Sequence, residues 1–232
     1  STNLESSLTS AEQLIGSLIE ISKLDAGNLK PRRQHFCVAD LLKVLNQEFQ
    51  ALCAEKPLGF HQVSSQATLY TDPIMLRRVL QNFLTNAIRY TDHGRVLLGC
   101  RRHTDAMEIQ VWDTGYGVPE ERLEDIFEEF QRIETGAHSQ TTGIGLGLAI
   151  AQRTAHTLDH KIRVHSVLGR GSMFAISVPI GDSDAVARLQ PESNVISQNM
   201  PADTRLLVID NDASILEGMT ALLSQWGCKV YT

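Results

Sequence analysis

The 232-residue chain is long enough for one large domain, or for one ordinary domain with parts of neighbouring domains at its ends. No apolar run approaches the roughly 20 residues of a membrane-spanning helix, and the four cysteines form no Cys-x-x-Cys pair, so we expect a cytoplasmic chain without membrane contact. With 21 Lys and Arg against 27 Asp and Glu, the formal charge of −6 argues against nucleic-acid binding. Any anionic ligand must be held by local groups.

The first 30 residues predict a helix. Apolar side chains recur between residues 4 and 21 at alternating spacings of four and three, which is typical of a helix packed against other helices. Gly27 stands at the left-handed position that follows many helix ends, and Pro31 lies beyond it. Because this helix has two apolar edges, we expect it to belong to a helical bundle.

Residues 31–180 alternate strand and helix signals and predict a mixed α/β (α+β) domain. Asp72 and Pro73 predict the N-cap and first residue of a helix that ends near Ile88. Asp40 predicts the N-cap of an earlier helix. The expected strands cover about 35–38, 60–63, 67–71, 95–102, 107–112, 162–166 and 172–179, and further helices cover about 120–127 and 145–158.

The last 50 residues predict a linker and the start of another domain. Residues 181–203 are polar and show no hydrophobic period, so we expect a flexible linker. A strand of buried type then ends in Asp210 and Asp212, and a helical pattern follows, so residues 204–232 predict one βα unit of a truncated parallel sheet. Since the chain starts at Ser1 without Met and stops within an apolar stretch, we interpret it as part of a longer protein.

Two asparagines on the best-defined helix form the first candidate site. Asn82 and Asn86 lie four residues apart on one helical face. An amide oxygen can ligate Mg²⁺ while the phosphates of a ligand supply the negative charge. The alternative is that both are polar residues at the edge of an amphipathic helix.

A strand end supplies the second candidate site. Asp113 ends an expected strand and precedes Gly115 and Gly117, which allow the backbone to bend closely around a flat ligand. A carboxylate that faces an apolar pocket there can accept a hydrogen bond from an exocyclic amine such as that of adenine. The alternative is a plain turn with a solvated carboxylate.

A glycine-rich loop at residues 142–148 leads into a helix, so its backbone N–H groups and the helix N-terminus can face a phosphate. It lacks the Gly-Lys-Ser/Thr of a Walker loop, and it follows no strand as a Rossmann turn would. The alternative is a set of small residues that allow close helix packing. A further glycine pair, Gly169 and Gly171, precedes Ser172 and by itself predicts only a hairpin turn.

In this order, the four motifs resemble the N box and the three glycine boxes of the ATP-binding domains of sensor histidine kinases, in the gyrase, Hsp90, histidine kinase and MutL superfamily. Residues 126–130 resemble the F box. The resemblance implies a Bergerat-type two-layer α/β sandwich over residues 31–180 that binds ATP and Mg²⁺ beneath a lid at 135–142. It implies nucleotide contacts by Asn82, Asn86, Arg89, Tyr90, Asp113, Gly115, Gly117, Val118, Arg132, Thr142, Gly143, Gly145, Leu146, Gly147, Leu148 and Ser172.

The same resemblance implies a role for several of these side chains. Asn86 would bind Mg²⁺ with the assistance of Asn82, and Arg89, with these two asparagines, would form the catalytic group. Arg89 and Tyr90 would lie near the phosphates or ribose. Asp113 would accept the hydrogen bond of the adenine amine.

The flanking segments resemble parts of a hybrid histidine kinase. Residues 1–30 resemble the second helix of the dimerisation and phosphotransfer hairpin, and residues 204–232 resemble the start of a receiver domain in which Asp210 and Asp212 would help to bind Mg²⁺. This implies a homodimer that works with a phosphoacceptor His helix and a receiver Asp. None of the eight histidines is followed by Asp or Glu, as the family's acceptor is, so we expect the nucleotide-binding half of a kinase without its own acceptor.

We therefore expect ATP-dependent phosphoryl transfer to a His on a separate helix. One alternative is an ATPase of the same superfamily, but those enzymes use a Glu to activate water where this chain has Asn82, which cannot take a proton. Another alternative is an ATP-sensing or scaffolding module without catalysis. The intact Asn86, Asp113 and glycine loop argue against this second alternative.

Overall fold

The chain divides into two compact units, Ser1–Val186 and Ala187–Thr232. The computed structural model describes residues 2–27, 29–131, 145–189, 205–208, 216, 218–220, 224 and 229–231.

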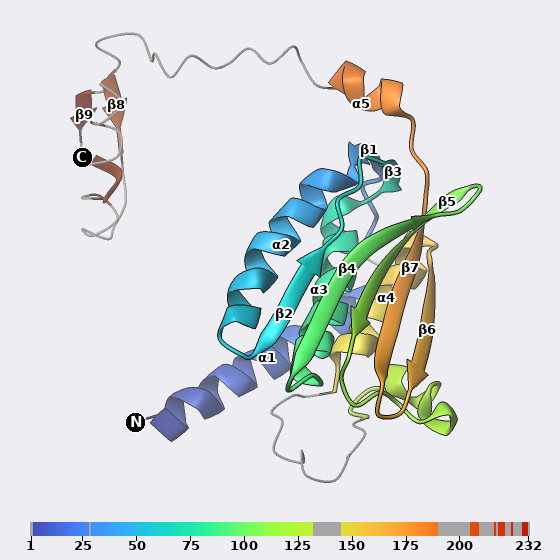
Figure 1. The fold of residues 1–232 in the computed structure, drawn as a ribbon. Helices are drawn as coiled ribbons and strands as arrows, with labels where there is room; N and C mark the ends of the chain where they lie inside the picture. The colour runs from blue at the N-terminus through green and yellow to red at the C-terminus, as the bar shows by residue number, and fades with distance from the viewer. Residues whose placement is uncertain are drawn as a thin grey trace. The chain divides into compact units, whose positions relative to one another are not determined.

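A five-stranded sheet forms the framework of the larger unit (Figure 1). In spatial order its strands are β2 (Leu58–Gln62), β4 (Gly94–Arg102), β5 (Ala106–Asp113), β7 (Gly171–Pro179) and β6 (Lys161–Val167). Only β2 and β4 pair in parallel. A separate antiparallel pair consists of β1 (Gln34–Cys37) and β3 (Thr68–Thr71). All seven expected strands are confirmed to within two residues.

Three helices, α2 (Val38–Ala54), α3 (Pro73–Arg89) and α4 (Gly147–Leu158), cover one face of this sheet (Figure 1). No described helix covers the other face. The predicted two-layer α/β sandwich is therefore confirmed. Its core lies between the layers and includes the fully buried Leu42, Leu45, Phe49, Leu76, Leu80, Phe83, Leu84, Leu98, Ile109 and Ile176.

Helix α3 begins where the sequence predicts. The Asp72 carboxylate accepts hydrogen bonds from the backbone N–H groups of Ile74 (2.9 Å) and Met75 (3.0 Å), and Pro73 occupies the first helical position. The other carboxylate oxygen accepts the N–H of Arg32 at 2.8 Å. Asp72 therefore also fixes the segment that enters the domain.

The predicted N-cap of α2 is wrong. The helix begins at Val38 after Cys37, whose side chain makes no cap hydrogen bond, and Asp40 lies within the first turn. The Val38 N–H donates instead to the carbonyl of Ala67 at 2.9 Å. The first backbone N–H of the helix therefore bonds to a distant part of the chain instead of to a capping side chain. The Asp40 carboxylate, within the first turn, interacts favourably with the helix dipole.

Three other segments differ in detail from the expectation. Residues 120–127 form two 3₁₀ turns, η1 (Glu120–Arg122) and η2 (Asp125–Phe127), instead of one helix. Helix α4 begins at Gly147, two residues later than expected. The segment expected to be a linker begins with a helix, α5 (Ser183–Leu189).

Helix α1 (Thr2–Asp25) is confirmed, and Gly27 beyond it adopts the expected positive φ of 63°. Its C-terminal end packs against α3 and α4 through Ile21 and Leu24, which form a small cluster with Met75, Leu146, Ile150 and Leu158. Two ion pairs join the same elements, Glu20 with Arg78 and Asp25 with Arg153.

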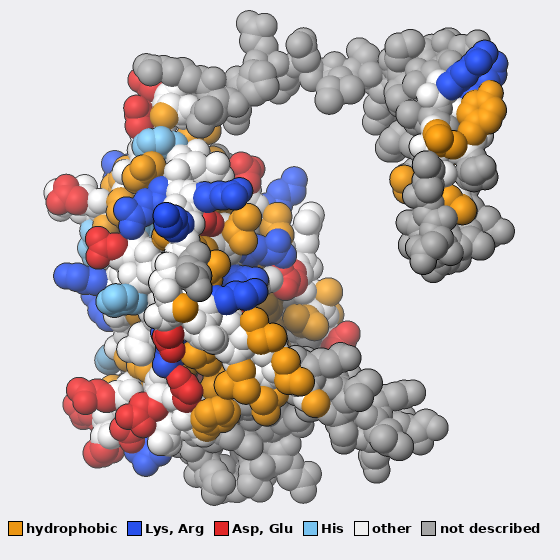
Figure 2. All heavy atoms as spheres, turned by 180° about the vertical axis from the view of Figure 1, so that it is seen from behind, with side chains coloured by type: hydrophobic (Ala, Val, Ile, Leu, Met, Phe, Trp, Pro, Cys, Tyr) orange, Lys and Arg blue, Asp and Glu red, His pale blue; other side chains and the backbone are white. Residues whose placement is uncertain are grey.

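Other apolar side chains of α1 remain exposed. Ile15 is 56% exposed and Ile19 is 49% exposed. Hydrophobic side chains gather on the lower part of the face that Figure 2 shows. Within the described ranges, neither α1 nor another helix combines the length and apolarity that crossing a membrane requires.

The smaller unit contains two short strands. β8 (Arg205–Leu207) and β9 (Lys229–Tyr231) pair in parallel, and Leu216 lies in a helical segment between them. Parallel neighbours need a crossover connection, as the predicted βα unit has. Asp210 and Asp212 lie outside the described residues, so the receiver assignment stays a prediction.

Candidate nucleotide site

A cleft, partly open to solvent, lies between the C-terminal end of α3, the end of β5, the 3₁₀ turns and the N-terminus of α4. It brings together ten of the predicted site residues, which come from four separate motifs. They are Asn86, Arg89, Tyr90, Asp113, Gly117, Val118, Gly145, Gly147, Leu148 and Ser172.

Three predicted residues are described but do not line this cleft. Leu146 is 2% exposed and packs in the cluster beneath α1. The Asn82 amide nitrogen donates to the carbonyl of Arg78 at 3.0 Å, and its oxygen lies beside Gly147. Gly115 packs against the end of α3. Arg132, Thr142, Gly143 and the predicted lid lie outside the described residues.

Asp113 is a buried carboxylate at the centre of the cleft wall. It is only 9% exposed, and its Oδ1 accepts the backbone N–H groups of Gly115 (2.8 Å) and Ser172 (3.2 Å). Burial raises its pKa from 3.8 to about 6, although the two N–H groups act in the opposite direction. Among the described residues, no group donates to Oδ2. This oxygen is therefore available to an N–H donor of a ligand.

Ser166 on β6 joins the two loops that frame Asp113. Its hydroxyl accepts the N–H of Val118 at 2.8 Å and donates to the carbonyl of Gly171 at 3.1 Å. It also lies 2.9 Å from the Ser172 hydroxyl. Because Val118 lines the cleft and Ser172 holds Asp113, one hydroxyl fixes both sides of this part of the pocket.

Two glycines are required here by close backbone packing. A Cβ on Gly115 would collide with the carbonyl of Tyr90, which also accepts the Tyr116 N–H at 3.2 Å. A Cβ on Gly171, whose φ is +117°, would collide with the carbonyl of Asp113. These glycines thus bring backbone segments together around Asp113, in addition to the ligand approach that the sequence predicts.

The part of the cleft at the start of α4 suits an anion. Gly145 and Gly147 line it at the start of α4, where Leu146 supplies no side-chain cap. The first N–H groups of a helix lack intrahelical partners and attract anions. Arg89 adds a positive charge and Asn86 an amide oxygen. The N–H groups and Arg89 fit the phosphate oxygens of a nucleotide, and the Asn86 amide oxygen fits Mg²⁺, because this ion usually takes few protein ligands beside phosphate oxygens.

Several lining residues were not predicted. Arg122 pairs with Asp125 at 3.1 Å and donates to the Gln131 side chain at 3.4 Å, and all three line the cleft. Tyr116 and Phe174 also contribute. Arg122 lies outside every glycine motif, in η1. Its contribution to the cleft depends on how the 3₁₀ turns pack in the fold, which no local sequence pattern predicts.

Comparison with protein families gives a match over residues 71–182 to the family described as histidine kinase-, DNA gyrase B-, and HSP90-like ATPase. The matched segment contains the whole described part of the cleft, from the start of α3 to the end of β7. It also contains Ser166.

Two curated relatives match a larger part of the chain. The autoinducer 2 sensor kinase/phosphatase LuxQ of Vibrio vulnificus (strain YJ016) is 27% identical over 208 residues, covering 86% of this chain and 24% of LuxQ. The sensor histidine kinase RcsC of Escherichia coli (strain K12) is 32% identical over 171 residues, covering 72% of this chain and 18% of RcsC. The chain thus spans a quarter or less of the length of these relatives.

A solved structure described as full-length ShkA in complex with AMPPNP superimposes with a TM-score of 0.69. The alignment covers 99% of this chain and 47% of that chain, with 24% sequence identity. At this identity the likeness shows the fold alone.

Proposed function

Because this chain belongs, through residues 71–182, to the ATP-binding domains of sensor histidine kinases in the histidine kinase-, DNA gyrase B- and HSP90-like ATPase family, we propose that its cleft binds Mg²⁺-ATP for phosphoryl transfer to a histidine. The observation that carries the proposal is the convergence of Asn86, Asp113 and the start of α4 on one cleft. Asp113 offers a buried acceptor for an amine, and the start of α4 offers donors for phosphates.

The proposal assigns nucleotide contacts to five side chains of the cleft and to the start of α4. The Oδ2 atom of Asp113 accepts the adenine amine, while Val118 and Leu148 provide apolar contacts to the ring. Arg89 and the first N–H groups of α4 hold phosphate oxygens, and the Asn86 amide oxygen holds the metal. Mg²⁺, when bound, neutralises negative charge on the phosphates.

The chemical step rests on positioning and electrostatics, which dominate phosphoryl transfer in general. Position 82 on α3 carries an asparagine instead of a carboxylate, and its amide, which donates to the Arg78 carbonyl, cannot act as a base. Slow hydrolysis of ATP is therefore expected. The phosphoryl group would pass to a His on a hairpin helix outside this sequence.

The further partners follow from the same assignment. The full-length protein would be a homodimeric hybrid kinase with this part of its chain in the cytoplasm, and a receiver Asp in the same or another chain would accept the phosphoryl group from the His. None of the eight histidines of this chain precedes an acidic residue, which is consistent with an acceptor His on another segment.

A transfer assay tests this function. The chain is mixed with a separately expressed first-helix hairpin carrying the His and with γ-labelled ATP, and acid-labile, base-stable phosphohistidine is measured. Label on the hairpin supports the proposal. Mg²⁺-ATP binding without any phosphohistidine would instead favour the scaffolding module, and an absence of ATP binding would contradict the site itself.

The metal assignment has its own test. The Asn86→Ala variant should lose the Mg²⁺ dependence of nucleotide affinity, because it removes the amide oxygen at the phosphate end of the cleft. Calorimetric titration with ATP, with Mg²⁺ or with EDTA, measures this. Thr85→Ala is the matched control, since Thr85 is exposed on the same helix and does not line the cleft. An unchanged Mg²⁺ dependence in Asn86→Ala would contradict the assignment.

A further inference from the structure

The face of the sheet opposite the helices carries an apolar row. Side chains alternate between the two faces of each strand, and the strand register aligns five outward positions across the sheet. Trp112, at the centre of this row, is 42% exposed. The complete row, from one edge to the other, is His61, Leu97, Trp112, Met173 and His165.

The same face is basic in an acidic chain. The outward positions of the five strands carry four Lys or Arg residues and one acidic residue, Glu108. The formal charge of these positions is therefore +3, within a chain of net charge −6. Glu108 is also only 4% exposed, so it presents little negative charge to solvent. The four basic residues are Arg95, Arg101, Lys161 and Arg163.

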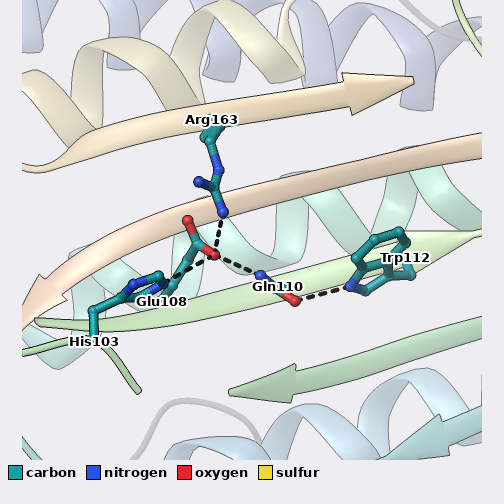
Figure 3. A network of polar contacts seen from close by, with 5 residues as sticks. All are labelled: His103, Glu108, Gln110, Trp112 and Arg163. Atoms are coloured by element: carbon teal, nitrogen blue, oxygen red, sulfur yellow. Dashed lines mark hydrogen bonds and ion pairs between the residues drawn. The ribbon is translucent and has the colours of Figure 1, made fainter. Parts of the chain in front are cut away.

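A hydrogen-bonded network fixes the tryptophan on this face (Figure 3). The indole N–H of Trp112 donates to the Gln110 side-chain oxygen at 3.0 Å, and the Gln110 amide donates to Glu108. Glu108 accepts Arg163 at 2.7 Å and lies 3.7 Å from His103 Nε2. The network holds an aromatic ring in place before any partner binds, which lowers the entropy cost of association.

We propose that this open face, centred on Trp112 and bordered by Arg101 and Lys161, docks an acidic protein segment that carries apolar anchor side chains. The positive charge selects the acidic partner, and the partly exposed Leu97 beside the indole provides a contact for its apolar side chains, while the buried Met173 supports the indole from the other side. Tryptophan and arginine are the side chains that most often dominate binding energy at protein interfaces.

The arrangement favours a protein partner over a single-stranded nucleic acid. Proteins that bind single strands stack successive bases on several aromatic rings. Trp112 is the single Phe, Tyr or Trp among the outward positions of the five described strands. Leu97 and Met173 beside it carry no ring on which a further base could stack.

The test uses fluorescent peptides with the entire chain. A peptide of alternating Glu and Leu is titrated, together with its counterpart in which Gln replaces Glu and with a single-stranded oligouridine. We expect the Glu peptide to bind more tightly than both other probes. The Lys161→Glu and Trp112→Ala variants should each weaken this binding by about tenfold.

Lys43→Glu on α2 is the matched control, because it makes the same charge change at an exposed position on the helical layer, and it should leave the affinity unchanged. ATP affinity should be unaltered in every variant, since none of these residues lines the cleft. Equal effects of Lys43→Glu and Lys161→Glu, or tighter binding of oligouridine than of the Glu peptide, would overturn the proposal.

Discussion

At the scale of single residues, Asp113 combines a proposed function with a cost in stability. Its carboxylate is buried, and burial raises its pKa to about 6. The folded state therefore favours the protonated form more than the unfolded state does. This contribution to stability is fully present below about pH 4 and is lost as the pH rises through about 6.

The Asp113→Asn variant should consequently be more stable than the wild type near neutral pH. A difference of about 2 pKa units corresponds to about 2–3 kcal/mol in the free energy of unfolding at pH 7. Denaturant unfolding of the nucleotide-free protein measures the gain, which should vanish near pH 4. Asp105→Asn, at an exposed site in the turn between β4 and β5, serves as the control. A variant that is less stable at pH 7 would contradict the assigned burial cost.

Ser166 is a positioning residue for the same pocket. The Ser166→Ala variant removes the hydroxyl that joins Val118 to Gly171, and we expect ATP affinity to fall about tenfold while Ser166→Thr restores most of it. Ser177→Ala, on the outward face of β7, is the matched control. A purely structural role would lower the melting temperature without changing the preference for adenine over guanine, so both are measured. If Ser166→Ala kept the wild-type preference for adenine over guanine nucleotides, the positioning role would be contradicted.

At the scale of elements, the end of α3 and the end of β5 are joined by direct backbone packing. Gly115 lies against the carbonyl of Tyr90, the C-cap residue of α3. Asn86 and Arg89, at the end of α3, line the same cleft as Asp113 at the end of β5. The geometry of the cleft therefore depends on the absence of a side chain at position 115.

Gly115→Ala should destabilise the fold by about 2–4 kcal/mol, because its Cβ would collide with backbone atoms that cannot move independently. The control is Gly16→Ala within α1, where a Cβ meets no atom within 4 Å and helix propensity predicts a gain of up to about 1 kcal/mol. Thermal unfolding of both variants measures the contrast. If Gly115→Ala and Gly16→Ala changed the free energy of unfolding by the same amount, the proposed collision at position 115 would be contradicted.

The sequence predicts elements well where their signals are local. Asp72 with Pro73 locates the start of α3 because the cap bonds come from Ile74 and Met75, only two and three residues along the chain. The start of α2 was missed, since the donor at Val38 is satisfied by Ala67, far along the chain. Ser166 could not be recognised either, because its role depends on the register between β6 and β7 and on the loop that contains Val118.

At the scale of the whole molecule, charge counts describe the chain but not its faces. The net charge of −6 predicts that phosphates are held by local groups, and the cleft offers a helix N-terminus, Arg89 and an amide that could serve this purpose. The same count conceals the basic face around Trp112, because strand alternation sorts charges only after the sheet has formed.

We propose above all that the cleft recognises adenine through a hydrogen bond to Asp113. The most direct measurement is the affinity for Mg²⁺-ATP and Mg²⁺-GTP, by calorimetry at pH 8, of the wild type and of Asp113→Asn. We expect the wild type to prefer ATP and the variant to lose affinity for ATP by at least about tenfold while its weak affinity for GTP changes little. Equal loss for both nucleotides, or an unchanged preference for ATP, would contradict the account.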